Sequence, residues 1–271
     1  MGVPTAAVRD RVRKKLERQE DTYEVQQLIK EKRSEEYEAF EEVFDKRTLM
    51  TIYDLMNKGE IDEIFGAVKA GKESKLYWGT NPKGEELAIK IYLTVSSEFR
   101  KGMLTYITGD PRFKHVRRDT RSLIYAWARK EFRNLTEAQE AKVRVPKPYN
   151  VQNNVLLMEF IGKNGISAPL LRETELRNPE KVYRSLLFNL KRLYKKAKLV
   201  HGDLSEYNIM YWKSRPWIFD VSQAVNLKHP NSAQFLTRDL ENLNRYFRKL
   251  GVEVFPLQEA YRRVTGGTAV R

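Results

Sequence analysis

The stretch that decides the fold runs from His201 to Met210 and reads HGDLSEYNIM. It holds Asp203 and, five positions later, Asn208, and an apolar segment delivers a further carboxylate, Asp220, twelve residues after Asn208. Transfer of a phosphoryl group needs a residue that orients the attacking oxygen, and hard oxygen ligands that hold Mg²⁺. The residue types, their order and the flanking apolar segments favour this chemistry over a capping Asp203, a turn Asn208 and an exposed Asp220.

These residues resemble the H-R-D-x-x-x-x-N and D-F-G elements of protein kinases, whose V-A-I-K lysine lies upstream in a strand. Residues 87–92 read LAIKIY, which predicts a short apolar strand carrying Lys90. A lone lysine in such a strand can simply protect a sheet edge from unwanted pairing. Its position 113 residues before Asp203 instead favours contact with the α and β phosphates of a nucleotide.

A lysine with this role pairs with a carboxylate from a helix. The helix predicted over residues 120–141 offers Glu131, Glu137 and Glu140. Most helix carboxylates are simply solvated. Apolar residues flank Glu131, however, so Glu131 is the favoured partner of Lys90.

The loop that would hold the phosphates lacks the G-x-G-x-x-G of ordinary kinases. Residues 71–77 read GKESKLY, and with a single glycine they could form an ordinary hairpin turn. The backbone at Gly71 and Lys72, together with the Ser74 hydroxyl, is nevertheless suited to binding phosphate oxygens.

Taken together, these segments resemble the RIO family of atypical serine/threonine protein kinases. The matching motifs of that family are S-x-G-K-E-x-x-x-Y at the phosphate loop, H-x-D-L-S-E-Y-N at residues 201–208 and I-D-x-x-Q at residues 218–224. The Asp-Val-Ser-Gln form at 220–223 resembles the type-one (Rio1-like) branch, and the first 47 residues show no winged-helix pattern of the Rio2 branch. The likeness covers about residues 48–265, including the tail from 229 to 240.

The resemblance implies catalytic roles for the matching residues. Lys90 contacts the phosphates, and Asp203 is the catalytic aspartate. Asn208 and Asp220 bind the metal, and Asp220 is further implied to accept a phosphoryl group during an ATPase-like cycle. The implied cofactors are ATP and Mg²⁺, with Mn²⁺ as a second candidate metal.

The resemblance also implies an adenine site. Residues 158–161 form the hinge, where the Glu159 carbonyl and the Ile161 N–H contact the adenine edge. The residues implied to line the adenine pocket are Ala88, Met158, Met210 and Phe219.

The chain departs from the family pattern at some positions. Lys69 and Ala70 replace a more usual Ser-Thr, which removes a hydroxyl contact, and Gly202 replaces a frequent alanine. No A-P-E follows Asp220, and 51 residues remain after it, so no room is expected for the platform that docks peptides in ordinary kinases. ATP binding, hydrolysis and autophosphorylation are therefore expected more strongly than activity on a peptide.

The order of elements predicts an α+β protein with a two-lobed, protein-kinase-like fold. The predicted parts are a helical extension over 1–47, a mainly β small lobe over 48–160 with a flexible basic loop at about 94–118, and a truncated helical large lobe over 161–271. Helices are predicted over 48–66, 120–141, 179–199, 231–250 and 256–264, and strands over 67–80, 87–92, 155–161, 208–212 and 216–219.

Composition excludes several other kinds of protein. The 271 residues contain no Cys, which excludes a disulfide framework, Cys-ligated zinc, an iron–sulfur cluster and a catalytic thiol. No apolar run approaches the ~18 residues of a membrane span, and no leader pattern opens the chain. A soluble, cytoplasmic protein without a membrane partner is expected.

The positive charge is unevenly distributed. The formal net charge is +14, with −1 on residues 1–50 and +15 on residues 51–271. Residues 181–200 carry seven Lys or Arg and no acid, and residues 98–118 carry six against two acids. A single basic face can be merely solvated, but two such segments favour RNA. The resemblance implies the precursor of the small ribosomal subunit and its rRNA as partners, and no DNA partner is expected.

The sequence therefore predicts a Mg–ATP-dependent kinase or ATPase with autophosphorylation, acting in small ribosomal subunit maturation. Two alternatives stay open. A small-molecule phosphotransferase of the aminoglycoside or choline kinase type shares the His-Gly-Asp-Leu pattern, but it needs an acidic substrate pocket. A non-catalytic RNA- or ribosome-binding module would keep the nucleotide site only as a vestige.

Overall fold

The computed structural model describes residues 44–94 and 97–267, with the backbone alone for residues 97–101. The chain divides into two compact units, Met1–Leu49 and Met50–Arg271. The helical extension predicted over residues 1–47 lies almost wholly outside the described residues. All the site residues discussed below belong to the larger unit.

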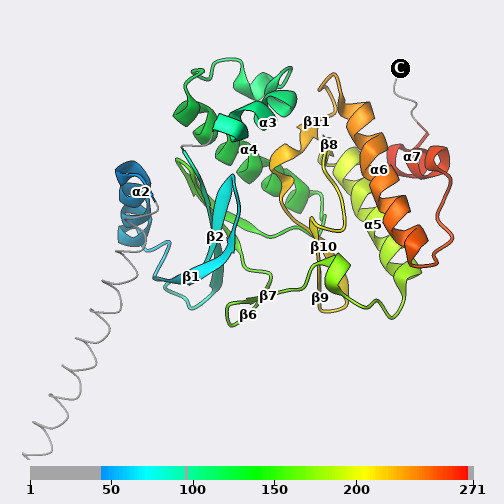
Figure 1. Cartoon of the computed structure of the whole chain (residues 1–271), viewed down its shortest axis with the longest axis horizontal. Coiled ribbons are helices and arrows are strands. Elements are labelled where there is room, and N and C mark those ends of the chain that lie inside the picture. Colours follow the sequence, from blue (N-terminus) through cyan, green and yellow to red (C-terminus); the bar gives the residue numbers. More distant parts are fainter. Residues whose placement is uncertain (1–43, 95–96, 268–271) are drawn as a thin grey trace, which may run out of the picture. The chain divides into compact units, whose positions relative to one another are not determined.

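Within the described residues, a five-stranded antiparallel sheet forms the small lobe (Figure 1). Its strands, in spatial order, are β1 (Glu63–Ala70), β2 (Ser74–Thr80), β3 (Glu86–Tyr92), β5 (Val155–Glu159) and β4 (Pro148–Gln152). β3 is central, and each of its residues from Leu87 to Tyr92 is buried. A strand covered on both faces reads as a continuous apolar run, which is why the sequence pattern identified it. The predicted meander of three strands is confirmed.

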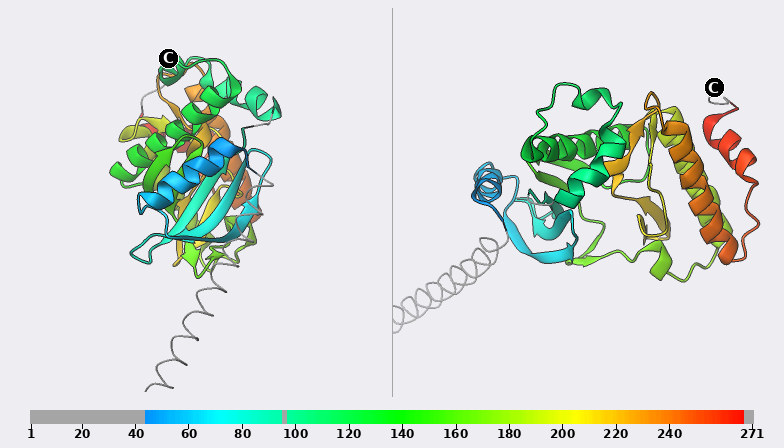
Figure 2. Two further views of the ribbon diagram at one scale, coloured as in Figure 1. Left: turned by 90° about the vertical axis from the view of Figure 1, so that its left-hand side faces the viewer. Right: turned by 45° about the horizontal axis from the view of Figure 1, so that its top comes forward.

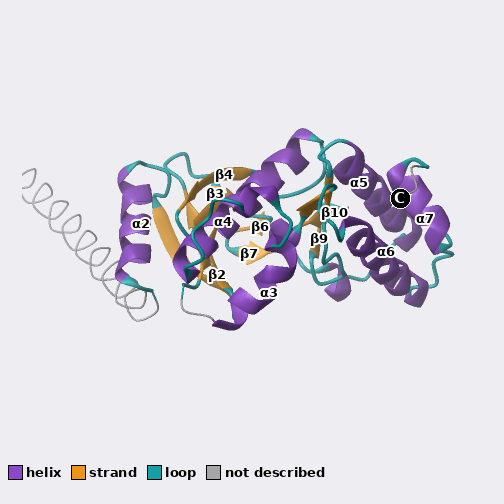
Figure 3. Ribbon diagram, turned by 90° about the horizontal axis from the view of Figure 1, so that it is seen from above, coloured by secondary structure: helices purple, strands orange, loops and turns teal. Residues whose placement is uncertain are grey.

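A long helix, α4 (Thr120–Glu140), packs against β4 and β5 of this sheet (Figure 3). Asp119 caps its N-terminus by accepting a hydrogen bond from the Ser122 N–H at 2.9 Å. The face that it buries includes the charged residues Lys130 and Glu131. The predicted helix over 120–141 is confirmed, and it carries charge into the interior.

The large lobe is mainly helical, as predicted. Its helices α5 (Pro179–Lys195), α6 (Ser232–Lys249) and α7 (Leu257–Thr265) pack side by side (Figures 1 and 2). Short strand pairs accompany them: β6 (Gly162–Lys163) with β7 (Ile166–Ser167), β8 (Leu199–Val200) with β11 (Val225–Asn226), and β9 (Ile209–Trp212) with β10 (Arg215–Ile218). In the described part of the chain, no helix is both long enough and apolar enough to cross a bilayer.

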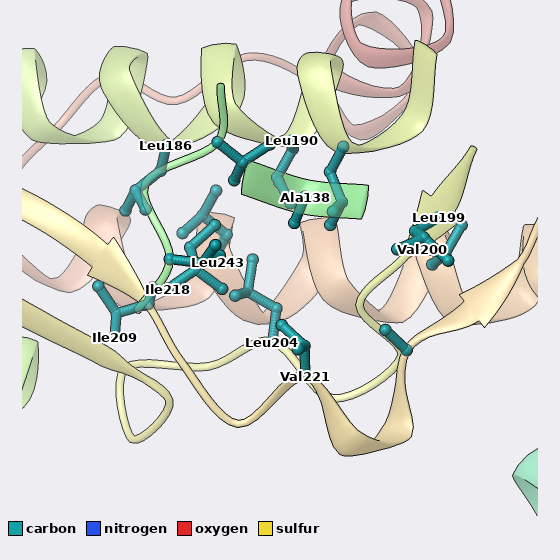
Figure 4. Close-up of a cluster of buried hydrophobic side chains, with 14 of the residues drawn as sticks. Ala138, Leu186, Leu190, Leu199, Val200, Leu204, Ile209, Ile218, Val221 and Leu243 are labelled. Carbon is teal, nitrogen blue, oxygen red and sulfur yellow. The ribbon is translucent and has the colours of Figure 1, made fainter. Parts of the chain in front are cut away.

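An apolar cluster holds the loops of the large lobe in place (Figure 4). Leu186 of α5 and Leu243 of α6 meet Leu204 of the 201–208 loop there, and each is at most 2% exposed. Ile218 and Val221, which flank Asp220 in the chain, are 1% exposed in the same cluster. Because these apolar neighbours are fixed in the core, the polar side chains between them have defined positions.

Residues 94–118 contain regular structure where the sequence predicts a loop. Helix α3 spans Ser97–Ile107, and a 3₁₀ turn, η1, spans Pro111–Phe113. The helix depends on tertiary contacts, since Tyr106 packs on Phe235 of α6 with ring centroids 5.3 Å apart. The loop prediction is wrong because few side chains of this segment are buried, which leaves no clear apolar period to read.

Two other predicted boundaries also differ from the structure. Helix α2 (Lys46–Asn57) ends near Gly59, whose φ of 68° is a left-handed conformation, whereas the prediction continued it to residue 66. Residues from Glu63 onward already belong to β1. Strand β4 was not predicted because it begins at Pro148, and proline marks a strand edge as readily as a loop.

Candidate active site

The 201–208 loop between β8 and β9 brings Asp203 and Asn208 together. The Asn208 Nδ2 donates to the backbone carbonyl of Asp203 at 2.8 Å and, more weakly, to its carboxylate Oδ2 at 3.4 Å. This orientation leaves the amide oxygen of Asn208 without a protein partner among the described residues. The carboxylate predicted to orient the acceptor and the amide predicted to bind the metal therefore lie side by side.

His201 supports the loop from the interior. It is 0% exposed, its Nε2 lies 3.3 Å from the Phe219 carbonyl, and the Asp203 N–H donates to its Nδ1 at 3.4 Å. Burial lowers the pKa of His201 to about 4, so the ring is neutral at pH 7. His201 therefore links the loop to the segment that carries Asp220.

Asp239 of α6 anchors the same loop, and the sequence analysis did not assign it a role. Its carboxylate accepts hydrogen bonds from the backbone N–H groups of Gly202 and Leu204, both at 2.8 Å, and is 0% exposed. Burial raises the pKa of Asp239 to about 7, against the lowering effect of the two N–H donors. The signal available in the sequence was a lone aspartate on the apolar face of a predicted helix.

We expect Asp239→Ala to lower the free energy of unfolding by about 2–4 kcal/mol at pH 8, because it leaves two buried N–H groups without acceptors. Asp239→Asn retains an acceptor oxygen and should lose roughly half as much. Urea denaturation followed by tryptophan fluorescence measures both. Equal stability of the wild type and the alanine variant would rule out this anchoring role.

Asp220 follows β10 with a left-handed backbone, φ 56° and ψ 57°. Aspartate tolerates this conformation better than most residues, and such geometry clusters at functional sites. The Phe219 N–H donates to the Asn208 carbonyl at 3.1 Å, which ties the Asp220 segment to the 201–208 loop. The Ser222 hydroxyl donates to Asp220 Oδ1 at 3.0 Å.

Lys90 joins the two lobes through an ion-paired group. Its Nζ lies 2.9 Å from Glu131 Oε2 and 2.9 Å from Asp220 Oδ1. Tyr92, which lies on the same strand as Lys90, donates a hydrogen bond from its hydroxyl to Glu131. Of the three candidates on helix 120–141, Glu131 is thus the carboxylate that meets Lys90. The strand lysine, the helix carboxylate and the aspartate after β10 converge although 130 residues separate Lys90 from Asp220.

The charges of this group stabilise one another. Burial opposes ionisation of Asp220, but the Lys90 ammonium and the hydrogen bonds from Lys90 and Ser222 hold the pKa of Asp220 at about 2. Burial likewise disfavours the charged form of Lys90, yet Asp220 and Glu131 raise the pKa of Lys90 well above its usual value. Both groups are therefore ionised at neutral pH.

Asp203 differs from Asp220 in its electrostatics. Burial and the negative charge of Asp220 raise the pKa of Asp203, although Arg238 and the Asn208 amide act in the opposite direction. A carboxylate with a raised pKa is a better proton acceptor. The two aspartates thus differ, since Lys90 holds Asp220 ionised whereas the pKa of Asp203 is raised.

Helix α4 positions the turn that follows Asp220, which is η3 (Val221–Gln223). The Lys130 ammonium donates to the Ser222 carbonyl at 2.5 Å, and the Asn134 amide donates to the carbonyls of Val221 and Ala224 at 2.8 and 3.1 Å. Lys130 and Asn134 were missed in the sequence because polar residues in a long charged helix read as solvent-exposed. The helix that supplies Glu131 therefore also holds the backbone next to Asp220.

The predicted phosphate loop is a tight turn between β1 and β2. The Gly71 N–H donates to the Ser74 carbonyl at 3.0 Å, and a Cβ on Gly71 would lie 3.1 Å from that oxygen. Gly71 and Lys72 are exposed and Ser74 is half-buried. Burial and the charges of Asp220 and Asp203 raise the pKa of Glu73, against the lowering effect of Lys90. Glu73 was not among the predicted site residues.

The residues expected around adenine lie on both sides of the lobe junction. Ala88 of β3 is paired with Met158 of β5, and both are buried. Glu159 ends β5, and the Ile161 N–H has no hydrogen-bond acceptor among the described residues. Met210 in β9 and Phe219 after β10 are both half-buried. The structure therefore leaves a backbone donor available at the predicted hinge.

The donor set suits a magnesium ion bound together with a nucleotide. Asp220 offers carboxylate oxygens with its side chain 43% exposed, and Asn208 offers an unpartnered amide oxygen. In the described part of the chain, no three His, Asp or Glu side chains are grouped closely enough to hold a metal ion alone. Mg²⁺ is usually held by one or two protein oxygens plus substrate phosphates and water, which agrees with this sparse set.

Comparison with known proteins identifies the family. The sequence-family model described as the RIO domain matches residues 75–260 of this chain. The RIO-type serine/threonine-protein kinase Rio1 of Haloferax volcanii is 38% identical over 257 residues, which cover 95% of this chain and 86% of that protein. The serine/threonine-protein kinase RIO1 of Caenorhabditis elegans is also 38% identical, but this chain spans about half of it, 51%.

Solved structures show the same fold. The Rio2 kinase of Chaetomium thermophilum, in a complex described as ADP/Mg²⁺-phosphoaspartate, superposes with a TM-score of 0.60 at 22% identity, over 79% of this chain and 65% of that one. The likeness confirms the two-lobed, kinase-like α+β architecture. With the RIO domain match and the Rio1 relatives, it establishes that this chain belongs to the RIO family of atypical serine/threonine protein kinases, on its Rio1-like branch.

Proposed function

We propose that this chain is a Mg–ATP-dependent serine/threonine kinase with ATPase activity and autophosphorylation, acting during maturation of the small ribosomal subunit. The observation that carries the proposal is the ion-paired group of Lys90, Glu131 and Asp220, joined through the Phe219–Asn208 hydrogen bond to the loop of Asp203. Burying a lysine between two carboxylates carries a desolvation penalty that the ion pairs do not necessarily repay, so such a group is better explained by a function than by stability. Phosphoryl transfer uses it to position a triphosphate.

Each residue has a separate task in this proposal. Lys90 contacts the α and β phosphates, and Gly71, Lys72 and Ser74 surround the outer phosphates. Asn208 and Asp220 would hold Mg²⁺, which supplies neutralisation of charge on the phosphate oxygens. Asp203 accepts the proton of the attacking hydroxyl or water. The adenine occupies the space bordered by the hinge.

Asp220 is also proposed as a phosphoryl acceptor in the ATPase cycle. A carboxylate oxygen of Asp220 attacks the γ-phosphorus, the bond to the β–γ bridging oxygen breaks, and ADP leaves. Water then hydrolyses the acyl phosphate and restores the carboxylate. The exposure of the side chain supports this step, as does the phosphoaspartate in the C. thermophilum Rio2 complex. Hydroxylamine cleaves acyl phosphates. If all the ³²P that [γ-³²P]ATP transfers to the chain is stable to acid and none is released by hydroxylamine, this step is excluded.

The proposed partners are ATP, Mg²⁺ or Mn²⁺, and the precursor of the small ribosomal subunit with its rRNA. The net charge of +14 supports a polyanionic partner, and the Rio1-like family supports a ribosomal one. The proposed location is the cytoplasm, with neither DNA nor membrane as a partner.

The proposal is tested by incubating the chain with [γ-³²P]ATP, with and without small ribosomal subunits, and mapping the labelled residue by mass spectrometry. We expect label on the chain itself and phosphate release that increases when subunits are added. Stimulation by aminoglycosides instead of subunits would favour a small-molecule phosphotransferase. Absence of Mg–ATP binding in calorimetry would favour a non-catalytic module.

A further inference from the structure

One face of helix α5 presents a row of cations to solvent. Its exposed positions recur every three or four residues, which places them in one line along the helix. We call this line the α5 stripe, and its members are Lys181, Arg184, Phe188, Lys191 and Lys195. The stripe is about 21 Å long at the rise of an α-helix. It lies on the large lobe, on residues that are not part of the nucleotide site.

The middle of the stripe is aromatic. Phe188 is 53% exposed even though the Arg192 guanidinium lies over its ring, 4.2 Å from the centroid. About half of this side chain therefore stays in contact with solvent, beside the guanidinium group.

A hollow of ≈ 240 Å³ adjoins Phe188 between α5 and α7. Leu187, Phe188 and Phe255 provide its apolar lining, and its charged lining comes from Arg184, Lys191 and Arg263. Arg263 stacks on Phe255 at 3.8 Å. The hollow thus combines aromatic faces with cations at its edge.

Further cations without acidic partners lie beside the stripe. Arg144 donates to the Ser185 hydroxyl at 3.0 Å, and Arg192 donates to the Lys142 carbonyl at 2.8 Å, so both guanidinium groups bond only neutral acceptors among the described residues. Burial and then the charges of Arg215 and Arg192 lower the pKa of Arg144. Clustered cations that repel one another gain stability when an anion binds between them.

We propose that the α5 stripe, with the hollow beside Phe188, binds single-stranded RNA. A base stacks on Phe188, and the phosphates run along the lysines of the stripe toward Arg144 and Arg192. Aromatic stacking combined with a cationic groove is the usual arrangement for single strands, whose bases are free to stack. This inference rests on the RNA partner of the proposed function and assigns that partner a surface.

The lining of the hollow favours a base over an acidic side chain. Arg184 is paired with Glu180, and Arg263 with Glu259, at 2.7 and 2.6 Å. Among the described residues, Lys191 is therefore the charged lining residue without an ion pair. A neutral base suits the aromatic lining, while its phosphates meet the lysines of the stripe.

Stacking is tested with Phe188→Leu and Phe188→Tyr, using fluorescence anisotropy of a labelled oligouridylate of about 12 nucleotides. Leucine keeps the volume but has no π face, so we expect it to weaken binding about 5-fold or more, whereas tyrosine stays within about 2-fold of the wild type. Because the side chain is half exposed, neither variant should unfold. Unchanged affinity of Phe188→Leu would overturn the stacking site.

Phosphate contact is tested through salt dependence. Lys181→Gln with Lys191→Gln should reduce the slope of log K against log salt by about 1.4, because each phosphate contact to a single strand contributes about 0.7. The matched control, Lys83→Gln with Lys163→Gln, removes the same charge from exposed positions elsewhere and should leave the slope unchanged. Equal slopes in both double variants would show a general charge effect and overturn the assignment.

The two proposals fail in different ways. If the wild-type chain does not bind the oligouridylate at low salt, the RNA partner of the proposed function falls with this surface, while ATP turnover is unaffected. If the wild type binds RNA and the α5 variants bind equally well, the surface is wrong and the RNA partner stands. If polyglutamate displaces the RNA, and if the binding of polyglutamate depends on Phe188, the surface is a peptide site and the assignment to RNA is wrong.

Discussion

Replacing Asp203 by Asn should lower the turnover of ATP by about 10²–10⁴-fold and leave the affinity for Mg–ATP nearly unchanged. The amide cannot accept the proton of the attacking hydroxyl or water, whereas the carboxylate, whose pKa is raised by burial, can. The Asn208 amide donates mainly to the backbone carbonyl of Asp203, and the substitution keeps that hydrogen bond. The loop and the predicted metal ligand should therefore stay in place.

The measurement is phosphate release together with autophosphorylation, with Mg–ATP binding followed by calorimetry. Glu206→Gln is the matched control, because it removes one carboxylate from the same loop without touching Asp203 or Asn208. We expect near wild-type turnover from this control. Wild-type turnover in Asp203→Asn would mean that another group receives the proton.

Replacing Asp220 by Asn should abolish the dependence of ATP binding on Mg²⁺ and lower phosphoryl transfer by about 10³-fold or more. The substitution removes a charged ligand from the predicted metal site and one of the two carboxylates that hold Lys90. Lys90 would then pair with Glu131 alone, 2.9 Å away. The metal would lose its charged ligand, and Lys90 would lose one of the two carboxylates that fix its position.

Calorimetric titration of ATP with and without Mg²⁺ measures this effect, since the two isotherms should coincide in the variant. Ser222→Ala is the control, because it removes just the 3.0 Å hydrogen bond to Asp220 Oδ1 and keeps the charge. The loss of one such bond should change the affinity by about 10-fold or less. A Mg²⁺-dependent increase in affinity that survives in Asp220→Asn would place the metal elsewhere.

The sequence predicted the residues of the candidate site where chemistry restricts the residue type. Phosphoryl transfer tolerates few substitutes for a strand lysine, a loop aspartate with its asparagine, and a second aspartate. Residue types, their order and the resemblance to kinases therefore indicated Lys90, Asp203, Asn208 and Asp220. The structure brings Lys90, Glu131 and Asp220 within ion-pair distance. Their catalytic roles stay predictions, and the Asp203→Asn and Asp220→Asn variants described above test two of them.

The sequence did not predict the residues that hold this group in place. Asp239, Lys130 and Asn134 bind backbone groups, and a backbone N–H or carbonyl is the same at every residue. Their partners lie 35 to 92 residues away along the chain. Nothing in the local sequence distinguishes such an anchor from a solvent-exposed polar residue.

Helix α3 shows the same limit for secondary structure. Its segment has no apolar period. The contacts that hold it come from α6, where Phe235 packs on Tyr106 and Arg238 donates a hydrogen bond to the Tyr106 hydroxyl. Periodicity reports burial against one continuous surface. A helix held by a few side-chain contacts does not produce it.

By itself, the sequence determined the family, the two-lobed fold class and the residues with chemistry to perform, because each of these depends on residue type and spacing. The tertiary structure alone decided which helix carboxylate meets Lys90, and in which direction burial and neighbouring charges shift the pKa of Asp203 and of Asp220. It also decided that Phe188 stands exposed in a line of cations on α5. These properties depend on burial and on distances between groups far apart in the chain, and only the folded protein sets those.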